Sequence, residues 1–237
     1  MSTKPVALVT GSSRGIGRAV ALALSRSGYR LILTARDEKT LKETGRGCEG
    51  GDAVILPMDL SEEDSPKRLA DAVNSETGQL DVLVNNAGIV VSKSFEDTGA
   101  ADWDRMMNLN ARAPFLLTRM LLPLLRISAA ATVVNIGSVV SFKGYEMQTA
   151  YAASKHALAG WTKVLAREEA SNGIRVHLIA PGGVATDLVR DVRPDIDESD
   201  LIAPEDVAEM VRFLTTHRSN AVIDVVEMHR AGKTPFS

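Results

Sequence analysis

The feature that most constrains this chain is a glycine-rich stretch directly after a short apolar run. The run at residues 6–9 is of β type, and Gly11-Ser-Ser-Arg-Gly-Ile-Gly17 follows it, before an amphipathic helix expected to reach about Gly28. Glycines permit positive φ and close backbone approach, and a helix N-terminus offers free N–H groups to an anion. This order of elements predicts a pyrophosphate cradle, although an ordinary tight turn uses the same residue types.

Apolar runs of strand type recur along the chain and alternate with helical segments. Further strands are predicted at residues 29–34, 53–58, 80–84 and 132–136. Open parallel sheets bind ligands at the carboxyl ends of their strands. Binding residues are therefore expected directly after the strands.

The second predicted strand ends in Ala35-Arg36-Asp37, where the adenosine ribose of a dinucleotide is expected. A guanidinium there accommodates the 2′-phosphate of NADP(H), whereas NAD(H) sites usually hold an acidic residue. Arg36, together with Arg14 in the glycine stretch, favours NADP(H). If Asp37 and not Arg36 occupies the ribose-binding position, its carboxylate argues for NAD(H). Asp37 is also suited to capping the helix that runs toward Cys48.

Polar residues also follow the third and fourth predicted strands. Asp59 either accepts a hydrogen bond from an adenine amino group or belongs to the turn before a helix that begins at Ser65 and Pro66. The segment Asn85-Asn86-Ala87-Gly88 suits a ligand crevice, but a plain turn also uses Asn and Gly. Both interpretations stay open for each pattern.

A predicted helix at residues 101–127 contains two prolines. Pro114 has no N–H for the carbonyl of Asn110, and its ring crowds that carbonyl, so a kink with a freed acceptor is expected near Asn110. The freed carbonyl could hold a water. An ordinary kinked core helix with an inward Asn bonded to the backbone explains the same pattern.

Tyr151 and Lys155 lie four residues apart and share one face of a predicted helix, with Ser138 upstream, after the fifth predicted strand. Thr149 is the expected cap, which places Tyr151 in the first turn. The helix dipole and the nearby ammonium are expected to lower the pKa of the Tyr151 phenol from its usual value of about 10. Such a phenol exchanges protons near neutral pH. Alone, the pair is also typical of a helix surface.

Taken in order, these motifs resemble the short-chain dehydrogenase/reductase family over roughly residues 4–216. The resemblance implies a Rossmann-type, doubly wound α/β fold, with a parallel seven-stranded sheet, helices on both faces and one domain over residues 1–237. Its sixth strand falls at residues 174–180, and a last strand is expected at 222–228. The motifs that carry it are Thr10-Gly-Ser-Ser-Arg-Gly-Ile-Gly17, Asp59, Asn85-Asn-Ala-Gly88, Asn110, Ser138, Tyr151-Ala-Ala-Ser-Lys155, and Pro181-Gly182 with Thr186.

The resemblance also implies roles for single residues. Tyr151 would be the general acid in carbonyl reduction and the general base in alcohol oxidation. Lys155 would bind the nicotinamide ribose and hold down the tyrosine pKa, Ser138 would hydrogen-bond the substrate oxygen, and Asn110 would hold a proton-relaying water. The positions implied to bind the cofactor are Gly11, Ser13, Arg14, Gly15, Ile16, Gly17, Arg36, Asp59, Leu60, Asn86, Ala87, Gly88, Tyr151, Lys155, Pro181, Gly182, Val184 and Thr186.

The implied activity is an NADP(H)-dependent oxidoreductase that transfers hydride between the nicotinamide and a carbonyl or secondary alcohol. The nearest-looking relatives are 3-oxoacyl-[acyl-carrier-protein] reductases and carbonyl reductases, so a ketone or 3-oxoacyl substrate is expected. Alternatives are an NAD-dependent alcohol dehydrogenase of the same family and a non-catalytic NADP(H)-binding regulatory protein. The filled catalytic positions argue against the non-catalytic alternative.

Partners are predicted less directly. Arg190 or Arg193 could help to dock an acidic acyl-carrier protein, but acidic residues surround both within the expected substrate loop at about residues 183–203. In relatives the helix that carries Tyr151 packs against its mate. The apolar residues between Ala157 and Leu165 therefore lead us to expect a homodimer or homotetramer, unless they fill a large intrachain core.

Composition excludes several other classes of protein. A net charge of −3 with scattered Lys and Arg leaves no footprint for nucleic acid. The longest apolar stretch, at residues 116–125, falls well short of the ~20 residues that span a bilayer, and the first residues are too brief for a signal peptide. One cysteine cannot form an internal disulfide, and the four histidines have no metal-ligand spacing. We expect a soluble, cytoplasmic protein with no metal and no membrane partner.

Overall fold

Seven strands form a single sheet in which every neighbouring pair is parallel. The computed structural model describes residues 4–50, 53–193 and 195–234. The strand order is β3-β2-β1-β4-β5-β6-β7, which confirms the predicted Rossmann-type sheet. The strands are β1 (Val6–Thr10), β2 (Arg30–Thr34), β3 (Val54–Ile55), β4 (Val82–Asn85), β5 (Thr132–Ile136), β6 (Arg175–Pro181) and β7 (Val225–Met228). Two predictions fall partly outside the described residues. Residues 1–3 begin the N-terminal segment that was expected to be too brief for a signal peptide, and Pro194 belongs to the expected substrate loop.

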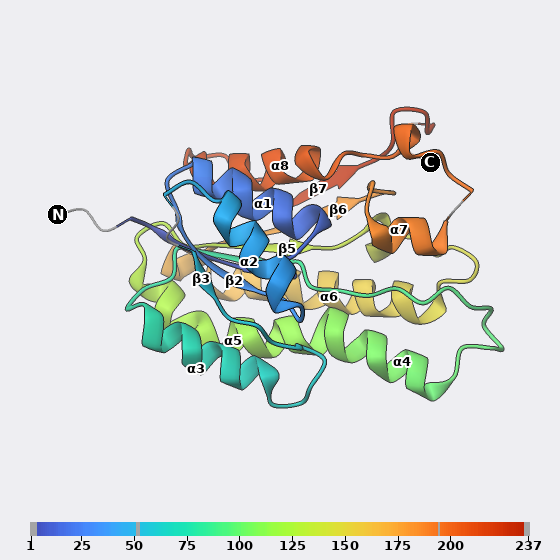
Figure 1. Ribbon diagram of the computed structural model, residues 1–237, viewed down its shortest axis with the longest axis horizontal. Coiled ribbons are helices and arrows are strands. Elements are labelled where there is room, and N and C mark those ends of the chain that lie inside the picture. Colours follow the sequence, from blue (N-terminus) through green and yellow to red (C-terminus); the bar gives the residue numbers. More distant parts are fainter. Residues whose placement is uncertain (1–3, 51–52, 194, 235–237) are drawn as a thin grey trace.

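Helices cover both faces of the sheet (Figure 1). They are α1 (Gly15–Arg26), α2 (Glu38–Gly47), α3 (Ser65–Glu76), α4 (Ala100–Met107), α5 (Ala113–Ile127), α6 (Thr149–Glu168), α7 (Asp187–Val192) and α8 (Pro204–Thr216). Apolar side chains of α1, α2 and α8 pack on one face, and those of α3, α5 and α6 pack on the other. None of the helices in the described ranges is both long and apolar enough to cross a membrane.

The central strands are apolar on both faces because each face has its own helical layer. Ala7 and Val9 of β1 belong to the core under α1 and α8, whereas Val6 and Leu8 belong to the core under α3 and α5. Alternate residues of a strand point to opposite faces, so a strand buried between two layers reads as a continuous apolar run. The apolar run that precedes the glycine stretch is therefore an interior strand of the sheet, buried on both faces.

Two elements differ from their sequence-based prediction. β3 has two residues instead of six, because it lies at the edge of the sheet and Pro57 has no N–H; the segment still follows β2 through hydrogen bonds from Leu56 and Met58. The long helix divides into α4 and α5 at a π-helical turn, Asn108–Arg112. This turn confirms the predicted distortion near Asn110, since the Pro114 ring prevents a regular α-helix there.

The expected cap of α6 is wrong. Thr149 is already the first helical residue, Gln148 holds the capping position, and no side chain caps this end. The physical reason is the loop before it, where Met147 adopts a φ of 65° and its carbonyl accepts from the N–H of Lys93. The chain turns sharply at Met147, so the Thr149 hydroxyl does not occupy the flanking position that capping requires.

His177 makes the stability of the fold sensitive to acid. It is 2% exposed, its Nδ1 must donate to the carbonyl of Ile223, and Nε2 has no partner in the described structure. Burial lowers the pKa of His177 below its usual value of about 6.5. Below about pH 6.5 the imidazole therefore binds a proton in the unfolded chain but not in the folded chain. As the pH falls, the free energy of unfolding decreases by at most about 1.4 kcal/mol per pH unit.

Replacement of His177 tests this dependence. His177→Asn keeps a hydrogen-bond donor near the Nδ1 position. We expect the free energy of unfolding of this variant, measured with urea, to decrease less between pH 7 and pH 5 than that of the wild type. The exposed His156 provides the matched control, His156→Asn, because solvent reaches its ring in both states. An unchanged slope in His177→Asn would assign the acid sensitivity to other groups.

Candidate active site

A cleft of about 490 Å³ opens at the carboxyl ends of the strands. It lies where the strand order reverses between β1 and β4, the position at which open parallel sheets bind ligands. The register pairs Val9 with Val84, so the loops after both strands enter the cleft side by side. All the residues expected to bind a cofactor line it except Gly17, and all the expected catalytic residues line it except Asn110.

The glycine stretch turns tightly along the wall of the cleft and has no room for a side chain at any of its three glycines. A Cβ on Gly17 would lie 2.1 Å from the carbonyl oxygen of Gly11, so Gly17 packs beneath the turn instead of lining the cleft. Gly15 has a φ of 53°, and a Cβ there would lie 2.9 Å from the side chain of Thr186. The N-terminus of α1 is thereby open to an anion, as the sequence predicted for a pyrophosphate cradle.

Thr10, which the sequence alone did not single out for a role, joins this turn to the loop after β4. Its Oγ1 accepts from the N–H groups of Asn86 and Ala87 at 2.9 and 3.0 Å. Asn86 Nδ2 in turn donates to the carbonyls of Thr10 and Gly11. The amide of Asn86 is thus occupied in holding the glycine turn. The signal for Thr10 was its place as the polar last residue of a buried strand.

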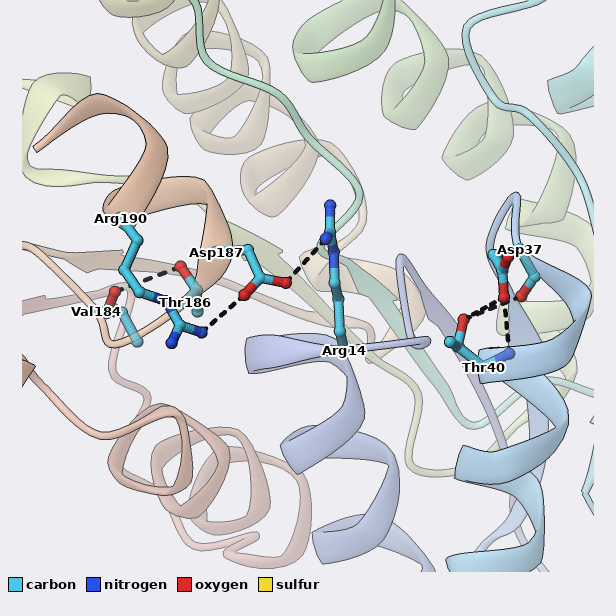
Figure 2. A network of polar contacts seen from close by, with 7 residues as sticks. All are labelled: Arg14, Asp37, Thr40, Val184, Thr186, Asp187 and Arg190. Carbon is cyan, nitrogen blue, oxygen red and sulfur yellow. Dashed lines mark hydrogen bonds and ion pairs between the residues drawn. The ribbon is translucent and has the colours of Figure 1, made fainter. Parts of the chain in front are cut away.

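At the end of the cleft beside β2, Asp37 and Arg36 have different surroundings. Asp37 caps α2, because its Oδ1 accepts from the N–H of Thr40 at 2.7 Å and from its hydroxyl at 2.6 Å (Figure 2). This confirms the capping interpretation. The Arg36 side chain is 58% exposed, and its Nη1 lies 3.9 Å from Asp59. Asp59 accepts from the N–H and hydroxyl of Ser61, so it belongs to a turn and also lines the cleft.

Ser138, Tyr151 and Lys155 meet at the other end of the cleft. Ser138 follows β5, while Tyr151 and Lys155 come from the first two turns of α6. The Ser138 hydroxyl lies near the phenol of Tyr151, and both line the cleft. Lys155 is 5% exposed, its Nζ donates to the carbonyl of Ile136 at 2.8 Å, and it lies 5.9 Å from the centre of the Tyr151 ring. No sequence pattern predicted the contact with Ile136.

The expected lowering of the tyrosine pKa is wrong for the protein alone. Burial raises the pKa of Tyr151 to about 12, and the hydrogen bond with Ser138 opposes this rise only in part. Burial also lowers the pKa of Lys155 to about 8. Desolvation disfavours the charged form of each group, and it outweighs the effects of the helix dipole and of the neighbouring ammonium. At neutral pH the site therefore holds a protonated phenol beside a mostly charged ammonium.

Asn110 lies behind the cleft and connects three elements. Its Oδ1 accepts from the N–H of Ile89, and its Nδ2 donates to the carbonyl of Ile89 and to the hydroxyl of Ser154. The inward side chain bonded to the backbone, one of the two predicted interpretations, is therefore present. Its own carbonyl lacks the usual helical donor four residues on, because Pro114 has no N–H.

The far wall of the cleft follows β6. The N–H of Gly182 donates to the carbonyl of Met228 at 2.7 Å, so β7 holds the Pro181-Gly182 turn in place. Val184 is buried and bridges to Ile202, which ties both ends of the expected substrate loop together. Thr186 then leads into α7, a short helix within that loop. The predicted last strand is thus present and supports this wall.

Known proteins resemble this chain in sequence and in structure. A family model described as short chain dehydrogenase matches residues 5–197. The chain belongs to the short-chain dehydrogenase family. A 3-oxoacyl-[acyl-carrier-protein] reductase from Synechocystis sp. is 33% identical over 229 residues, which cover 93% of each protein. An acetoacetyl-CoA reductase from Cupriavidus necator is 33% identical over 92% of this chain and 93% of its own. The solved active-site complex of Pseudomonas aeruginosa RhlG with NADP is 34% identical, with a TM-score of 0.85 over 95% of this chain and 94% of that one.

Membership of the short-chain dehydrogenases establishes the chemical class. The protein is an oxidoreductase that acts on a CH–OH group or the corresponding carbonyl of a small molecule with a nicotinamide cofactor. The predicted family is confirmed. The glycine turn at the N-terminus of α1 and the basic Arg36 both line the cleft, and they fit such a dinucleotide. In the part of the chain that the structure describes, no three His, Cys, Asp or Glu side chains converge as metal ligands would.

Proposed function

We propose that this short-chain dehydrogenase reduces a ketone or a 3-oxoacyl thioester with NADPH. The observation that carries the choice of cofactor is the pair at the end of β2. Both side chains line the cleft, but Asp37 is engaged in capping α2, whereas Arg36 has only a loose contact with Asp59. A carboxylate engaged in a cap is a poor acceptor for a ribose hydroxyl, whereas a planar guanidinium suits a phosphate. Several similar solved structures contain NADP, which supports the same choice.

The catalytic assignment follows from the protonation states of the two titratable groups. A bound nicotinamide supplies the hydride. Tyr151, protonated at neutral pH, donates its proton to the oxygen of the substrate carbonyl, and Ser138 hydrogen-bonds the same oxygen. The Lys155 ammonium stabilises the phenolate that remains and binds the ribose hydroxyls of the cofactor. Reduction is the direction in which Tyr151 acts as the acid, and NADPH as the cofactor favours that direction.

The carbonyl of Asn110 is the group we assign to hold a water. Its place one turn before Pro114 leaves it without the usual helical donor, and its side chain reaches Ser154 in the turn that carries Tyr151 and Lys155. A water held there offers Lys155 a route to replace the proton that leaves Tyr151. The other residues expected to bind the cofactor keep the assignments made from the resemblance, with Gly17 acting through the shape of the turn.

The substrate class rests on the relatives and on the charge of the substrate loop. The two curated relatives described above are named for 3-oxoacyl-[acyl-carrier-protein] and acetoacetyl-CoA. Arg190 and Arg193 are each engaged by acidic neighbours in their own loop, which argues against a carrier-protein docking site built on them. We therefore expect a 3-oxoacyl thioester of CoA or a simple ketone to be turned over without a carrier protein.

Turnover with defined substrates tests the proposal. Loss of NADPH absorbance is followed with acetoacetyl-CoA and with a panel of ketones, and the dissociation constants of NADPH and NADH are titrated by fluorescence. Turnover with NADPH and tighter binding of NADPH support the proposal. Tighter binding of NADH would overturn the choice of cofactor, and binding of NADPH without turnover of any carbonyl would favour a regulatory protein.

Reversal of charge at Arg36 tests the phosphate contact directly. We expect Arg36→Asp to weaken the binding of NADPH by about 10- to 100-fold, because a charge-assisted hydrogen bond is worth about 1.5–3 kcal/mol. The affinity for NADH should stay nearly unchanged. Arg26→Asp, an equal change of charge at the exposed end of α1, is the control. Equal loss of affinity for both cofactors would show that Arg36 supports the fold of the cleft and does not bind the 2′-phosphate.

We also propose that the protein assembles through the face formed by α5 and α6. Phe115 and Val164 are 44% and 53% exposed, and Phe115 contacts the ring of Trp161 edge to face. Large apolar side chains exposed together on a monomer are typical of an interface. A homodimer or homotetramer in analytical ultracentrifugation would support this proposal, and a monomer at micromolar concentration would exclude it.

A further inference from the structure

Arg14 of the glycine turn forms an ion pair across the cleft with Asp187, the first residue of α7. Its Nη1 donates to Oδ2 of Asp187 at 2.8 Å, and Arg190, one turn along α7, donates to Oδ1 at 2.7 Å (Figure 2). The carboxylate of Asp187 thus lies between two guanidiniums. Arg14 and Asp187 are 173 residues apart in the chain, so this contact belongs to the tertiary structure alone.

The two arginines that could reach a 2′-phosphate are therefore in different states. Arg36 has only a loose contact with Asp59, at 3.9 Å, whereas Arg14 is engaged at hydrogen-bond distance. Both partners of the Arg14–Asp187 pair line the cleft. The pair also lies beside the close contact between Gly15 and Thr186, which sets the distance between the glycine turn and α7.

We propose that Asp187 competes with the 2′-phosphate of NADP(H) for Arg14 and so limits the preference of this enzyme for NADP(H) over NAD(H). The inference rests on the proposed NADP(H) function. An ion pair that must break before a ligand can use one of its partners reduces the affinity for that ligand. NAD(H) has no 2′-phosphate and leaves the pair intact, so the penalty falls on NADP(H) alone.

The expected size of the effect is modest because the pair is exposed. The side chains of Arg14 and Asp187 are 68% and 43% exposed, and ion pairs at such positions are worth little in water. Arg190 already satisfies the other oxygen of Asp187, so the carboxylate keeps a partner when Arg14 leaves. We expect removal of the carboxylate charge to tighten the binding of ligands that carry a 2′-phosphate by about two- to five-fold.

Titrations with matched nucleotides test the competition. Asp187→Asn is titrated with adenosine 2′,5′-bisphosphate and AMP, and then with NADPH and NADH, with protein fluorescence or calorimetry as the readout. We expect tighter binding of the bisphosphate and of NADPH, and unchanged binding of AMP and NADH. Asp191→Asn is the control, because Asp191 lies four residues further along α7, is exposed and has no ion pair among the described residues.

The same titrations in an Arg14→Ala chain separate competition from general repulsion. We expect Arg14→Ala to reduce the preference for NADPH, and Asp187→Asn to have no further effect on that chain. If Asp187→Asn tightens NADPH binding even in the Arg14→Ala chain, competition for Arg14 is ruled out, and repulsion between Asp187 and the phosphate explains the effect. Equal weakening of both cofactors in Asp187→Asn would overturn it in favour of a clasp that closes over either one.

The remaining outcomes distinguish this inference from the function on which it rests. A wild-type protein that prefers NADPH, with an unchanged ratio of affinities in Asp187→Asn, would overturn the inference alone. A wild-type protein with no preference for NADPH would overturn the proposed cofactor before any variant is considered.

Discussion

Tyr151→Phe is expected to reduce turnover by at least about 100-fold while leaving the affinity for NADPH nearly unchanged. General acid catalysis by a positioned side chain contributes about 10²- to 10⁴-fold, and Phe removes the proton donor without removing the ring. Burial raises the pKa of Tyr151 to about 12, so the phenol holds its proton at neutral pH. No other phenol lines the described cleft to replace it.

The measurement is steady-state turnover of a carbonyl substrate, paired with a fluorescence titration of NADPH. Tyr29→Phe is the matched control, because its hydroxyl donates to the carbonyl of Thr215 and it does not line the cleft. Turnover in Tyr151→Phe within ten-fold of the wild type would contradict the assigned role. Loss of NADPH binding in the same variant would assign Tyr151 to the binding of the cofactor and not to the proton transfer.

Lys155→Ala is expected to weaken cofactor binding and turnover together. The ammonium is proposed to hold the ribose and to stabilise the phenolate of Tyr151, so its loss removes a charge-assisted contact worth about 1.5–3 kcal/mol, or about 10- to 100-fold in the dissociation constant. Turnover should fall further, because Tyr151 gives up its proton less readily without the nearby charge. Lys163→Ala, an exposed position further along α6, is the control.

The pH dependence of binding gives Lys155 a second signature. Burial lowers the pKa of Lys155 to about 8, so the ammonium is present below pH 8 and is lost above it. The affinity of the wild type for NADPH should therefore weaken as pH rises through about 8, and the Lys155→Ala variant should lack this change. A purely kinetic defect, with unchanged affinity at every pH, would contradict the ribose contact.

Local patterns predicted the frame of the site well. The glycine stretch identified the turn after β1, because only glycine fits where a Cβ on Gly17 would meet a carbonyl at 2.1 Å. Pro114 identified the distortion that appears as the π-helical turn Asn108–Arg112, since a missing N–H is a property of the residue itself. The spacing of Tyr151 and Lys155 placed both on one side of α6 before any tertiary contact was considered.

The same local reasoning failed where the surroundings of a group decide its chemistry. It predicted a lowered pKa for Tyr151, whereas burial raises that pKa to about 12. It left Asp37 open between a ribose contact and a helix cap, which the hydrogen bonds from Thr40 decide in favour of the cap. It placed the cap of α6 at Thr149, but the left-handed turn at Met147 starts the helix one residue too early for that.

The sequence by itself determined the order of the elements, the glycine turn and the identity of the side chains at the carboxyl edge of the sheet, because periodicity, missing side chains and missing N–H groups act over a few residues. Only the tertiary structure decided how those side chains are engaged. Desolvation depends on every element packed around Tyr151 and Lys155, and the pairing of Arg14 with Asp187 joins residues 173 positions apart. Distances across a folded cleft are set by the packing of whole helices and strands, which no local pattern contains.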